Sequence, residues 1–583
     1  MQLFFAAILL VGQDTSEAAK LVVQHEGRLK PLDTFARQLM QSLTDKERFE
    51  GYKDASDQFV KVFPGGDPVY AVLKMIAQPA EVRELRFIKI NHPTLRKDWK
   101  LDEKLTYYSL SDLQESRARL REAMREIDPE DATSDQIALL KVDSQIRSIE
   151  QLHREEIFAI VPVLFGENRS WMTPTDVRRW LAGEAANDRR SVVIAEALTS
   201  WTTKDPSRRA LLQTASDSYA AAMRGFTQGD MAGFAPLLAS LRLLNPAGYP
   251  EESRILTELR YNRVRPFHWA GYVFLAAWLT YLMGLVFESR KIGWASWIVH
   301  VGGLVLMAVG YVLRYQISGR HPLSNHYESM MACAMGAGLV AAILETFFKP
   351  ANVMGLAGTL VAWILVALAN TVPTFAEQGF MAPLVPALNT FWMAIHVPVI
   401  MLGYAMGMVL AVLAHIHLIK VLARRSTPEW EATMDRVLYR VLQLCVLFLL
   451  CGIILGAVWA GEAWGRPWGW DMKETWALIT LLCYIAILHA RFMGVLRPFG
   501  TSVSALVAFQ VMILTYYGVN FVFGKGLHSY GRGSGDVYSL IAFASVELLF
   551  LGVVFYVQLI SRIKNIGNPR PPSPPHTQDF PIV

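Results

Sequence analysis

The residues best suited to chemistry in this sequence form one short stretch, W-G-R-P-W-G-W-D at Trp464–Asp471. Three tryptophans and an aspartate fall within eight residues, and Trp459 and Trp476 flank them. One interpretation is a belt of tryptophans at a membrane surface, which is common in membrane proteins. The two glycines and the proline instead favour a shaped loop. Indole faces lining such a loop would make a flat apolar platform, which suits a large planar ligand such as a porphyrin.

Two histidines lie on either side of this stretch in the sequence. His396 is near the start of an apolar run, and His528 lies in G-L-H-S-Y-G. Two neutral imidazoles beside a flat platform could bind a haem iron from opposite faces. Taken singly, each histidine is more simply a hydrogen-bonded structural residue. Both interpretations stay open at this point.

Four more histidines lie within or at the ends of apolar runs. His489 and His300 fall at similar depth inside their runs, and ionisable residues inside a membrane are functional candidates by default. A second haem site at that depth is one interpretation. A hydrogen bond between helices is the other, and for His300 we favour it. His415 and His417 are typical of anchors at the membrane surface.

The composition indicates a polar half joined to a membrane half. Of the 583 residues, 52% are hydrophobic and 18% are charged. Residues 1–265 hold 37 Lys/Arg and 38 Asp/Glu, whereas residues 266–583 hold 19 and 13. The net charge of +5 therefore lies in the apolar half, and nothing indicates nucleic-acid binding. The four cysteines all lie in apolar runs without C-x-x-C spacing, which argues against a disulfide framework and a thiol-redox role.

We predict an all-α fold, with a polytopic bundle of nine membrane spans behind a mostly helical extracytoplasmic domain. A span needs about 20 apolar residues, and the runs that satisfy this are 267–287, 294–313, 329–347, 352–372, 391–419, 439–460, 475–493, 501–523 and 537–561. The connecting segments on one side hold thirteen Lys/Arg and those on the other side six. Because Lys and Arg concentrate in cytoplasmic loops, we expect the C-terminus inside and residues before 265 outside.

Four regions follow from this pattern. Residues 1–18 contain the apolar stretch Leu3–Gly12, which is typical of a signal peptide or of the end of a longer span. Residues 19–265 form the expected extracytoplasmic domain, and residues 266–561 form the membrane domain with the tryptophan-rich loop. Residues 562–583 are proline-rich, and we expect a disordered cytoplasmic tail.

The motifs of the membrane half together resemble one known family. W-G-R-P-W-G-W-D matches the W-G-x-x-W-x-W-D signature of haem-handling proteins of cytochrome c maturation, called the WWD domain. H-P-L-S-N-H-Y-E-S at His321–Ser329, F-W-M-A-I-H-V at Phe391–Val397 and I-L-H-A-R at Ile487–Arg491 are similar to further segments of that family. The whole resembles the CcsA (ResC)-type subunit of the system II cytochrome c synthase over about residues 267–560. CcmF of system I shares the signature and is the nearest competitor.

The resemblance implies a holocytochrome c synthase, or haem lyase, that acts in a complex. Such a protein works with a CcsB (ResB)-type partner in the bacterial cytoplasmic membrane. It exports haem b, which is both substrate and non-covalent cofactor, and joins it to the two thiols of a C-x-x-C-H motif in an apocytochrome c. The thiols must be reduced, which implies a thiol-reducing protein as a further partner.

The resemblance also assigns roles to residues. His396 and His528 would be the axial ligands of an external haem, and His489 would be one ligand of a transmembrane haem whose other ligand comes from the partner. His300 is the alternative for that other ligand. The residues expected to form the haem platform are Trp464, Gly465, Trp468, Trp470 and Asp471. Arg466, Lys473 and Arg532 are either partners for the haem propionates or plain loop charges.

The polar half departs from a plain CcsA. The segment His25–Arg37 resembles an external segment that precedes CcsA in fused relatives, and we expect the domain to dock the partner or to hold the apocytochrome. Two alternative functions remain. One is a membrane electron carrier with bis-histidine haems, and the other is a transporter for a non-haem aromatic solute.

Overall fold

The computed structural model describes residues 17–54, 56–128, 133–166, 169–348, 352–376, 379–384, 386–521 and 537–567. The signal-like stretch Leu3–Gly12, the tail beyond residue 567 and His528 lie outside these residues. The chain divides into two compact units, each considered by itself. The first contains residues 1–270, 305–328 and 367–386, and the second contains residues 271–304, 329–366 and 387–583.

The N-terminal part of the first unit is mostly helical, as predicted, and also contains small sheets. Its helical segments are η1 (Glu17–Lys20), α2 (Leu32–Thr44), η2 (Pro64–Gly66), α3 (Pro68–Ala77), α4 (Pro79–Val82), α5 (Pro93–Asp98), α6 (Arg117–Ala123), α7 (Ser134–His153), α8 (Pro174–Leu181), α9 (Arg189–Thr203), α10 (Ser207–Thr227), α11 (Phe234–Leu244) and α12 (Glu252–Val264). Side chains of Thr133 and Gln136 form a capping box that starts α7. Buried aromatic and aliphatic side chains, with Phe35, Phe63 and Phe158 among the largest, form one core.

Four two-stranded antiparallel sheets complete this part of the chain. They pair β1 (Val22–His25) with β2 (Arg28–Pro31), β3 (Gly51–Lys53) with β4 (Phe59–Lys61), β5 (Ile88–Lys89) with β6 (Tyr107–Tyr108), and β7 (Val161–Phe165) with β8 (Ser170–Met172). The tip of the β1–β2 hairpin, at Glu26 and Gly27, has positive φ at both residues. The motif His25–Arg37 therefore contains the last residue of β1, the turn, all of β2 and the first turns of α2.

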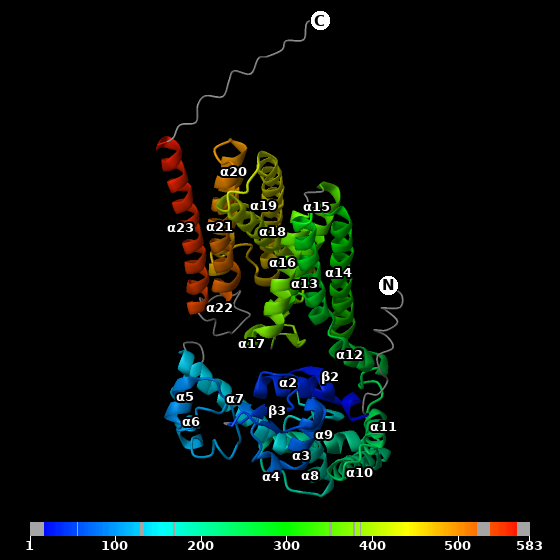
Figure 1. Cartoon of the computed structure of the whole chain (residues 1–583). Helices are drawn as coiled ribbons and strands as arrows, with labels where there is room; N and C mark the ends of the chain where they lie inside the picture. The colour runs from blue at the N-terminus through cyan, green and yellow to red at the C-terminus, as the bar shows by residue number, and fades with distance from the viewer. Residues whose placement is uncertain are drawn as a thin grey trace, which may run out of the picture. The chain divides into compact units, whose positions relative to one another are not determined.

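Nine helices in the described part of the chain are long and apolar enough to cross a membrane (Figure 1). Their segments are α13 (Pro266–Val286, continuous with α12), α14 (Arg290–Ser318), α15 (His326–Phe348), α16 (Val353–Thr371), α18 (Phe391–Leu422), α19 (Pro428–Trp464), α20 (Met472–Phe492), α21 with η5 and α22 (Pro498–Ile513, Leu514–Gly518, Val519–Phe521) and α23 (Val537–Gly567). Short α17 (Pro373–Ala376) and η4 (Pro386–Leu388) lie between α16 and α18. The nine predicted spans are therefore confirmed.

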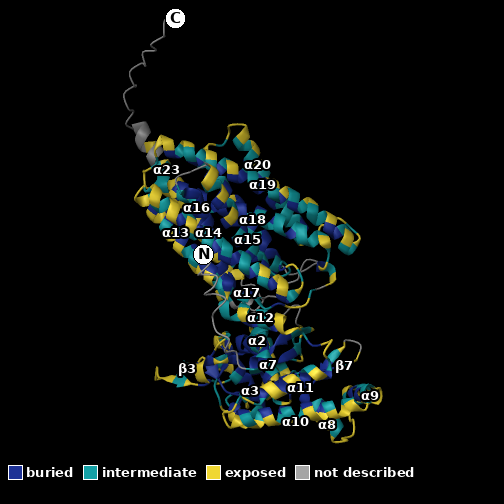
Figure 2. Cartoon of the chain, turned by 90° about the vertical axis from the view of Figure 1, so that its right-hand side faces the viewer, coloured by how far each residue is buried: buried dark blue, intermediate teal, exposed yellow. Residues whose placement is uncertain are grey.

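The second unit is a helix bundle built around α18. The most apolar stretch of α18 is 72% buried, whereas that of α23 is 17% buried, and buried residues concentrate around α18 in Figure 2. Contacts at both ends show that α18 and α19 are antiparallel: His396 approaches Gly452, and His417 bonds Glu431. An ion pair between Arg491 and Asp435 shows the same for α19 and α20. The starts of α18 and α20 therefore lie at one end of the bundle, with the loop that follows α19.

A buried ionic cluster in the first unit holds the segment His321–Ser329. Arg314 of α14 donates to Glu328 of α15 at 2.5 Å, and both side chains are about 1% exposed. Arg314 also donates to the carbonyl of Gly379 at 2.7 Å and to Tyr261 Oη at 3.1 Å. Glu328 accepts from the backbone N–H of Ser324 at 2.8 Å. Because every charge in the cluster has a partner, the burial of these charges is tolerated.

Loss of one member of this cluster should be strongly destabilising. Glu328→Gln leaves Arg314 buried without a counter-charge, and we expect the free energy of unfolding to fall by about 3–5 kcal/mol. The double variant Arg314→Met/Glu328→Leu buries no charge and should regain part of this loss. Thermal unfolding of the purified full chain measures the effect, with Glu126→Gln at an exposed position as the control. A melting temperature of Glu328→Gln equal to that of the control would contradict the prediction.

Candidate functional site

The stretch Trp464–Asp471, called the tryptophan loop from here on, connects α19 to α20. Gly465 ends α19 with a left-handed conformation, φ 71°, and its N–H bonds the carbonyl of Gly461. Asp471 starts α20 by accepting from the backbone N–H of Glu474 at 2.9 Å. Glu474 in turn accepts from the N–H of Gly469 at 2.6 Å. The two ends of the loop are thus fixed by a helix C-cap and a capping box.

The tryptophans of the loop take part in two aromatic pairs, one of them with Trp459 of α19. Trp464 packs edge-on against Trp459 with ring centroids 4.6 Å apart, and Trp468 packs edge-on against Trp470 at 5.7 Å. Trp459 is buried, whereas Trp470 is 69% exposed. In the described part of the chain the buried Nε1 of Trp468 has no hydrogen-bond partner. An exposed indole and an unused buried donor fit a loop that receives a ligand.

His396 lies against α19 with its orientation and tautomer fixed. Its Nδ1 is 2.8 Å from the carbonyl oxygen of Gly452, which only accepts, so Nδ1 donates and the lone pair of the neutral ring is on Nε2. The imidazole plane is parallel to Trp459 within 2° at a centroid distance of 6.1 Å. The same backbone bond at Nδ1 is the usual support of a metal-binding histidine.

Two glycines of α19 make room for this histidine and its helix. A Cβ placed on Gly456 would lie 2.8 Å from His396 Cε1, and one placed on Gly452 would lie 2.7 Å from a side-chain carbon of Ile400. Both distances are below normal contact, so α18 approaches this closely only because these residues are glycine. Neither glycine was predicted from the sequence, although they are spaced four residues apart on one helix.

His489 lies near the far end of α20 from the tryptophan loop, on an exposed part of the helix surface. It is 17 residues from the start of α20 at Met472, or about 26 Å along the axis, whereas His396 is about 8 Å from the start of α18 at Phe391. The two histidines thus belong to opposite ends of the bundle. His489 Nδ1 donates to the carbonyl of Ile485 at 2.9 Å, which again leaves the lone pair on Nε2.

His300 is buried inside the bundle, whereas His489 is exposed on the surface of α20. It is fully buried among Phe274, Tyr281 and Gly338, and its Nε2 has no hydrogen-bond partner among the described residues. Its Nδ1 is 3.5 Å from Tyr281 Oη. This environment fits the interpretation as a packed, helix-bridging histidine.

His415 and His417 make specific contacts between helices. His417 is fully buried, with Nδ1 2.8 Å from Ser502 Oγ and Nε2 3.1 Å from Glu431. His415 Nε2 is 3.2 Å from Glu547 of α23. Both residues lie toward the end of α18, and both connect α18 to other helices of the bundle.

Three basic residues near the tryptophan loop are candidates for contacts with haem propionates. The Arg466 guanidinium lies over Gly469, where an added Cβ would be 1.0 Å from Nη1, so a side chain at this position would displace the guanidinium. Lys473 donates to the carbonyl of Thr515 at 3.1 Å and to Asn520 Oδ1 at 3.3 Å. Lys473 thus serves contacts within the bundle. The third candidate, Arg532, lies outside the described residues, as does the second external histidine, His528.

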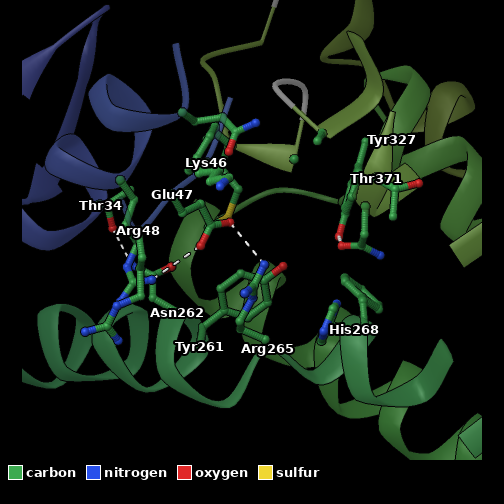
Figure 3. A pocket seen from close by; sticks show the side chains of 18 of the residues that line it. Thr34, Lys46, Glu47, Arg48, Tyr261, Asn262, Arg265, His268, Tyr327 and Thr371 are labelled. Carbon is green, nitrogen blue, oxygen red and sulfur yellow. Dashed lines mark hydrogen bonds and ion pairs between the residues drawn. The ribbon is translucent and has the colours of Figure 1, made fainter. Parts of the chain in front are cut away.

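The motif at His25–Arg37 lines a cavity of about 340 Å³ in the first unit (Figure 3). Its lining includes Thr34, Arg37, Glu47, Arg265 and Tyr327. Glu47 lies 3.3 Å from Arg37 and 3.5 Å from Arg265, so these charges are paired. The neighbouring Asp45 is desolvated, but Lys141 and Lys89 outweigh this and hold the pKa of its carboxyl below the usual value. None of the expected haem-binding residues that the structure describes lines this cavity.

The chain is similar in sequence to known proteins of one family. Residues 323–528 match the family model described as cytochrome c assembly protein. The cytochrome c biogenesis protein CcsA of Chlamydomonas reinhardtii is 36% identical over 254 residues, which cover 42% of this chain and 71% of that protein. CcsA of Guillardia theta is 34% identical over 285 residues, which cover 44% of this chain and 92% of that protein.

A further relative and a solved structure also show similarity to this chain. Protein NrfI of Wolinella succinogenes is 27% identical over 559 residues, which cover 88% of this chain and 54% of that protein. Among solved structures, cytochrome c haem lyase CcmF has a TM-score of 0.37 at 14% identity, covering 53% of this chain and 51% of that one. On the CcsA matches, this multi-pass membrane protein belongs to the cytochrome c assembly family and is a CcsA-type cytochrome c biogenesis protein.

Proposed function

We propose that this protein moves haem b to the outer face of the bacterial cytoplasmic membrane and holds it there for attachment to apocytochrome c. The observation that carries the proposal is the fixed imidazole of His396, stacked along Trp459 beside the tryptophan loop. A histidine whose Nδ1 is held by a backbone carbonyl presents Nε2 to a metal in one orientation. Membership of the CcsA family supports haem as the group bound.

In this proposal His396 and His528 are the two axial ligands of the external haem. The indoles of Trp464, Trp468 and Trp470 provide apolar surface for the macrocycle, while Gly465 and Asp471 hold the ends of the loop. The chain's contribution is positioning, which can supply much of a rate enhancement when reacting groups are held at the right distance. No general acid or base is assigned.

The reaction joins a cysteine thiol of the C-x-x-C-H motif to a haem vinyl group. The S–H bond and the vinyl π bond break, a C–S bond and a C–H bond form, and no electrons are gained or lost. The thiols must be supplied in the reduced state, which a thiol-reducing partner protein provides.

His489 is proposed as one ligand of a second haem site at the other end of the bundle. Its exposure on α20 leaves room for a ligand from a second protein, and a CcsB (ResB)-type subunit is the proposed source. The buried position of His300 makes it the weaker choice for this ligand. Two sites at opposite ends fit transfer of haem across the membrane.

The orientation in this proposal follows the distribution of Lys and Arg. The connecting segments on the side of the C-terminus hold thirteen of these residues against six on the other side. The tryptophan loop and the N-terminal domain are then outside, where the apocytochrome is. The domain would dock the partner subunit or hold the apocytochrome.

The ligand assignment predicts the spectra of histidine variants. His396→Ala and His528→Ala, co-expressed with a CcsB-type partner, should lower external haem and cytochrome c maturation by roughly tenfold or more. Added imidazole should restore the low-spin spectrum, because it replaces the missing ligand. His489→Ala should lose the other haem. Reduced-minus-oxidised spectra, haem staining and yield of holocytochrome measure these effects.

The control for this series is His92→Ala, because His92 pairs with Asp135 in the N-terminal domain and should leave both haems unchanged. Wild-type protein without haem would contradict the proposed function. So would histidine variants that all retain wild-type spectra.

The packing of His396 on α19 gives a second prediction. Gly456→Ala places a methyl group 2.8 Å from His396 Cε1, so the imidazole must move. External haem and holocytochrome yield should then fall by roughly tenfold, as for loss of a ligand's support. Gly461→Ala, on the same helix with open space around the added methyl group, is the matched control. Equal haem content in the two variants would show that this packing does not position the ligand.

A further inference from the structure

We propose that a cavity beside the ends of three membrane spans binds the phosphate group of an anionic phospholipid. It is the cavity of about 340 Å³ drawn in Figure 3, called the basic cavity from here on, and all of its lining residues belong to the first unit. The lipid comes from the leaflet on the side of the N-terminal domain. None of the described candidate haem ligands lines the cavity, so lipid binding there does not depend on the proposed function.

The lining residues place the basic cavity at the level where spans end. Phe267 is the second residue of α13, Tyr327 is the second residue of α15, and Thr371 is the last residue of α16. Trp269, near the start of α13, is 56% exposed, and Tyr315, near the end of α14, is 50% exposed. Exposed Trp and Tyr near span ends are typical of the membrane–water interface. The cavity therefore lies at the depth of the lipid headgroups.

Positive side chains outnumber negative ones around the basic cavity. Four basic and two acidic residues line it, and they are Arg37, Lys46, Arg48, Arg265, Asp45 and Glu47. Glu47 lies 3.3 Å from Arg37 and 3.5 Å from Arg265. Asp45 pairs with Lys89 at 3.0 Å and with Lys141 at 2.8 Å, neither of which lines the cavity. Both carboxylates are thus paired, and the repulsion they exert on an anion is weakened.

Lys46 and Arg48 remain available to an anion. In the described part of the chain neither side chain makes a hydrogen bond or an ion pair, and both residues are exposed. Exposure alone would equally fit two solvated surface charges. Arg48, however, also lines a neighbouring cavity of about 290 Å³, together with Arg263 and Arg265. The convergence of these cationic groups on adjoining cavities favours a bound phosphate, since guanidinium groups bind phosphate oxygens in pairs and ammonium groups bind them as point charges.

The size and the two unlike sides of the basic cavity favour a lipid headgroup. Its volume lies at the lower end of the range of about 300–1,000 Å³ for sites of small ligands. Figure 3 shows Arg48 on one side of the cavity and Tyr327 with Thr371, from the ends of spans, on the other. An amphipathic ligand is suited to such a site. Basic pockets between membrane helices are a recurrent way of holding anionic headgroups.

The test measures lipid binding by the full chain. The purified protein in detergent is titrated with dioleoyl phosphatidylglycerol, and bound lipid is counted by native mass spectrometry. We expect the wild type to bind this lipid more tightly than the zwitterionic dioleoyl phosphatidylethanolamine. Lys46→Gln and Arg48→Gln should each weaken phosphatidylglycerol binding by roughly fivefold, and the double variant should weaken it by roughly twentyfold, because each removes one basic side chain from the headgroup.

The matched control is the double variant Lys97→Gln/Lys104→Gln. It removes the same charge from exposed positions of the N-terminal domain that line neither cavity, and it should bind phosphatidylglycerol as the wild type does. Thr371→Phe provides a second route if the charge variants fail to fold. It fills part of the basic cavity without changing any charge, and it should also weaken phosphatidylglycerol binding severalfold while leaving the melting temperature near that of the control.

Three results would overturn the proposal. The first is equal binding of the two lipids by the wild type, or equal affinity of the Lys46→Gln/Arg48→Gln variant and its control for phosphatidylglycerol. The second is calorimetric binding of inorganic phosphate that requires Arg48, without binding of phosphatidylglycerol, which would identify a site for a free anion. The third is a lower holocytochrome yield in Lys46→Gln/Arg48→Gln without phosphatidylglycerol binding by the wild type, which would indicate an acidic segment of a partner protein instead.

Discussion

The close packing of α18 against α19 is the constraint on which the site depends. An imidazole binds a metal in a defined geometry only when its ring orientation and tautomer are fixed. Here the carbonyl of Gly452 fixes both, and it reaches His396 because Gly452 and Gly456 leave no side chain between the helices. In lipid there is little hydrophobic driving force for helix association. Van der Waals packing between closely approaching helices, which small residues allow, supplies much of the stabilisation instead. The same glycines therefore stabilise the helix pair and orient the candidate ligand.

A polar group inside a membrane protein is costly unless it finds a partner within the protein. Arg314 and Glu328 satisfy one another together with backbone groups. Lys473 instead donates to the carbonyl of Thr515, which lies in the π-helical turn η5. The two solutions differ in consequence. The first holds a loop with paired charges, whereas the second joins a charge to a local irregularity of the helix backbone.

The sequence predicts the spans well because each membrane-crossing helix needs a continuous run of apolar residues, which can be read directly from the sequence. All nine helices were predicted, yet α19 begins at Pro428, eleven residues before the predicted run at 439, because its first turns are polar and hydropathy does not detect them. The residues of the tryptophan loop were also identified by type and spacing. Their contacts were not, since the bonds of His396 to Gly452 and of Lys473 to Thr515 join residues 56 and 42 positions apart. The small sheets of the N-terminal part were missed for another reason: their strands are only two to five residues long, which is too short for a clear alternating pattern.

The environments of His396 and His489 imply different ways of completing a haem site. His396 is held by a second helix and lies along a buried indole, so in the proposed function its haem site is built mainly within the chain. His489 takes its Nδ1 support from its own helix, at Ile485, and faces outward. The remaining contacts of a ligand that is fixed only by its own helix must come from a protein that packs on that helix. In the proposed function, the partner subunit is therefore part of the second site, whereas the external site needs the partner only to receive its haem.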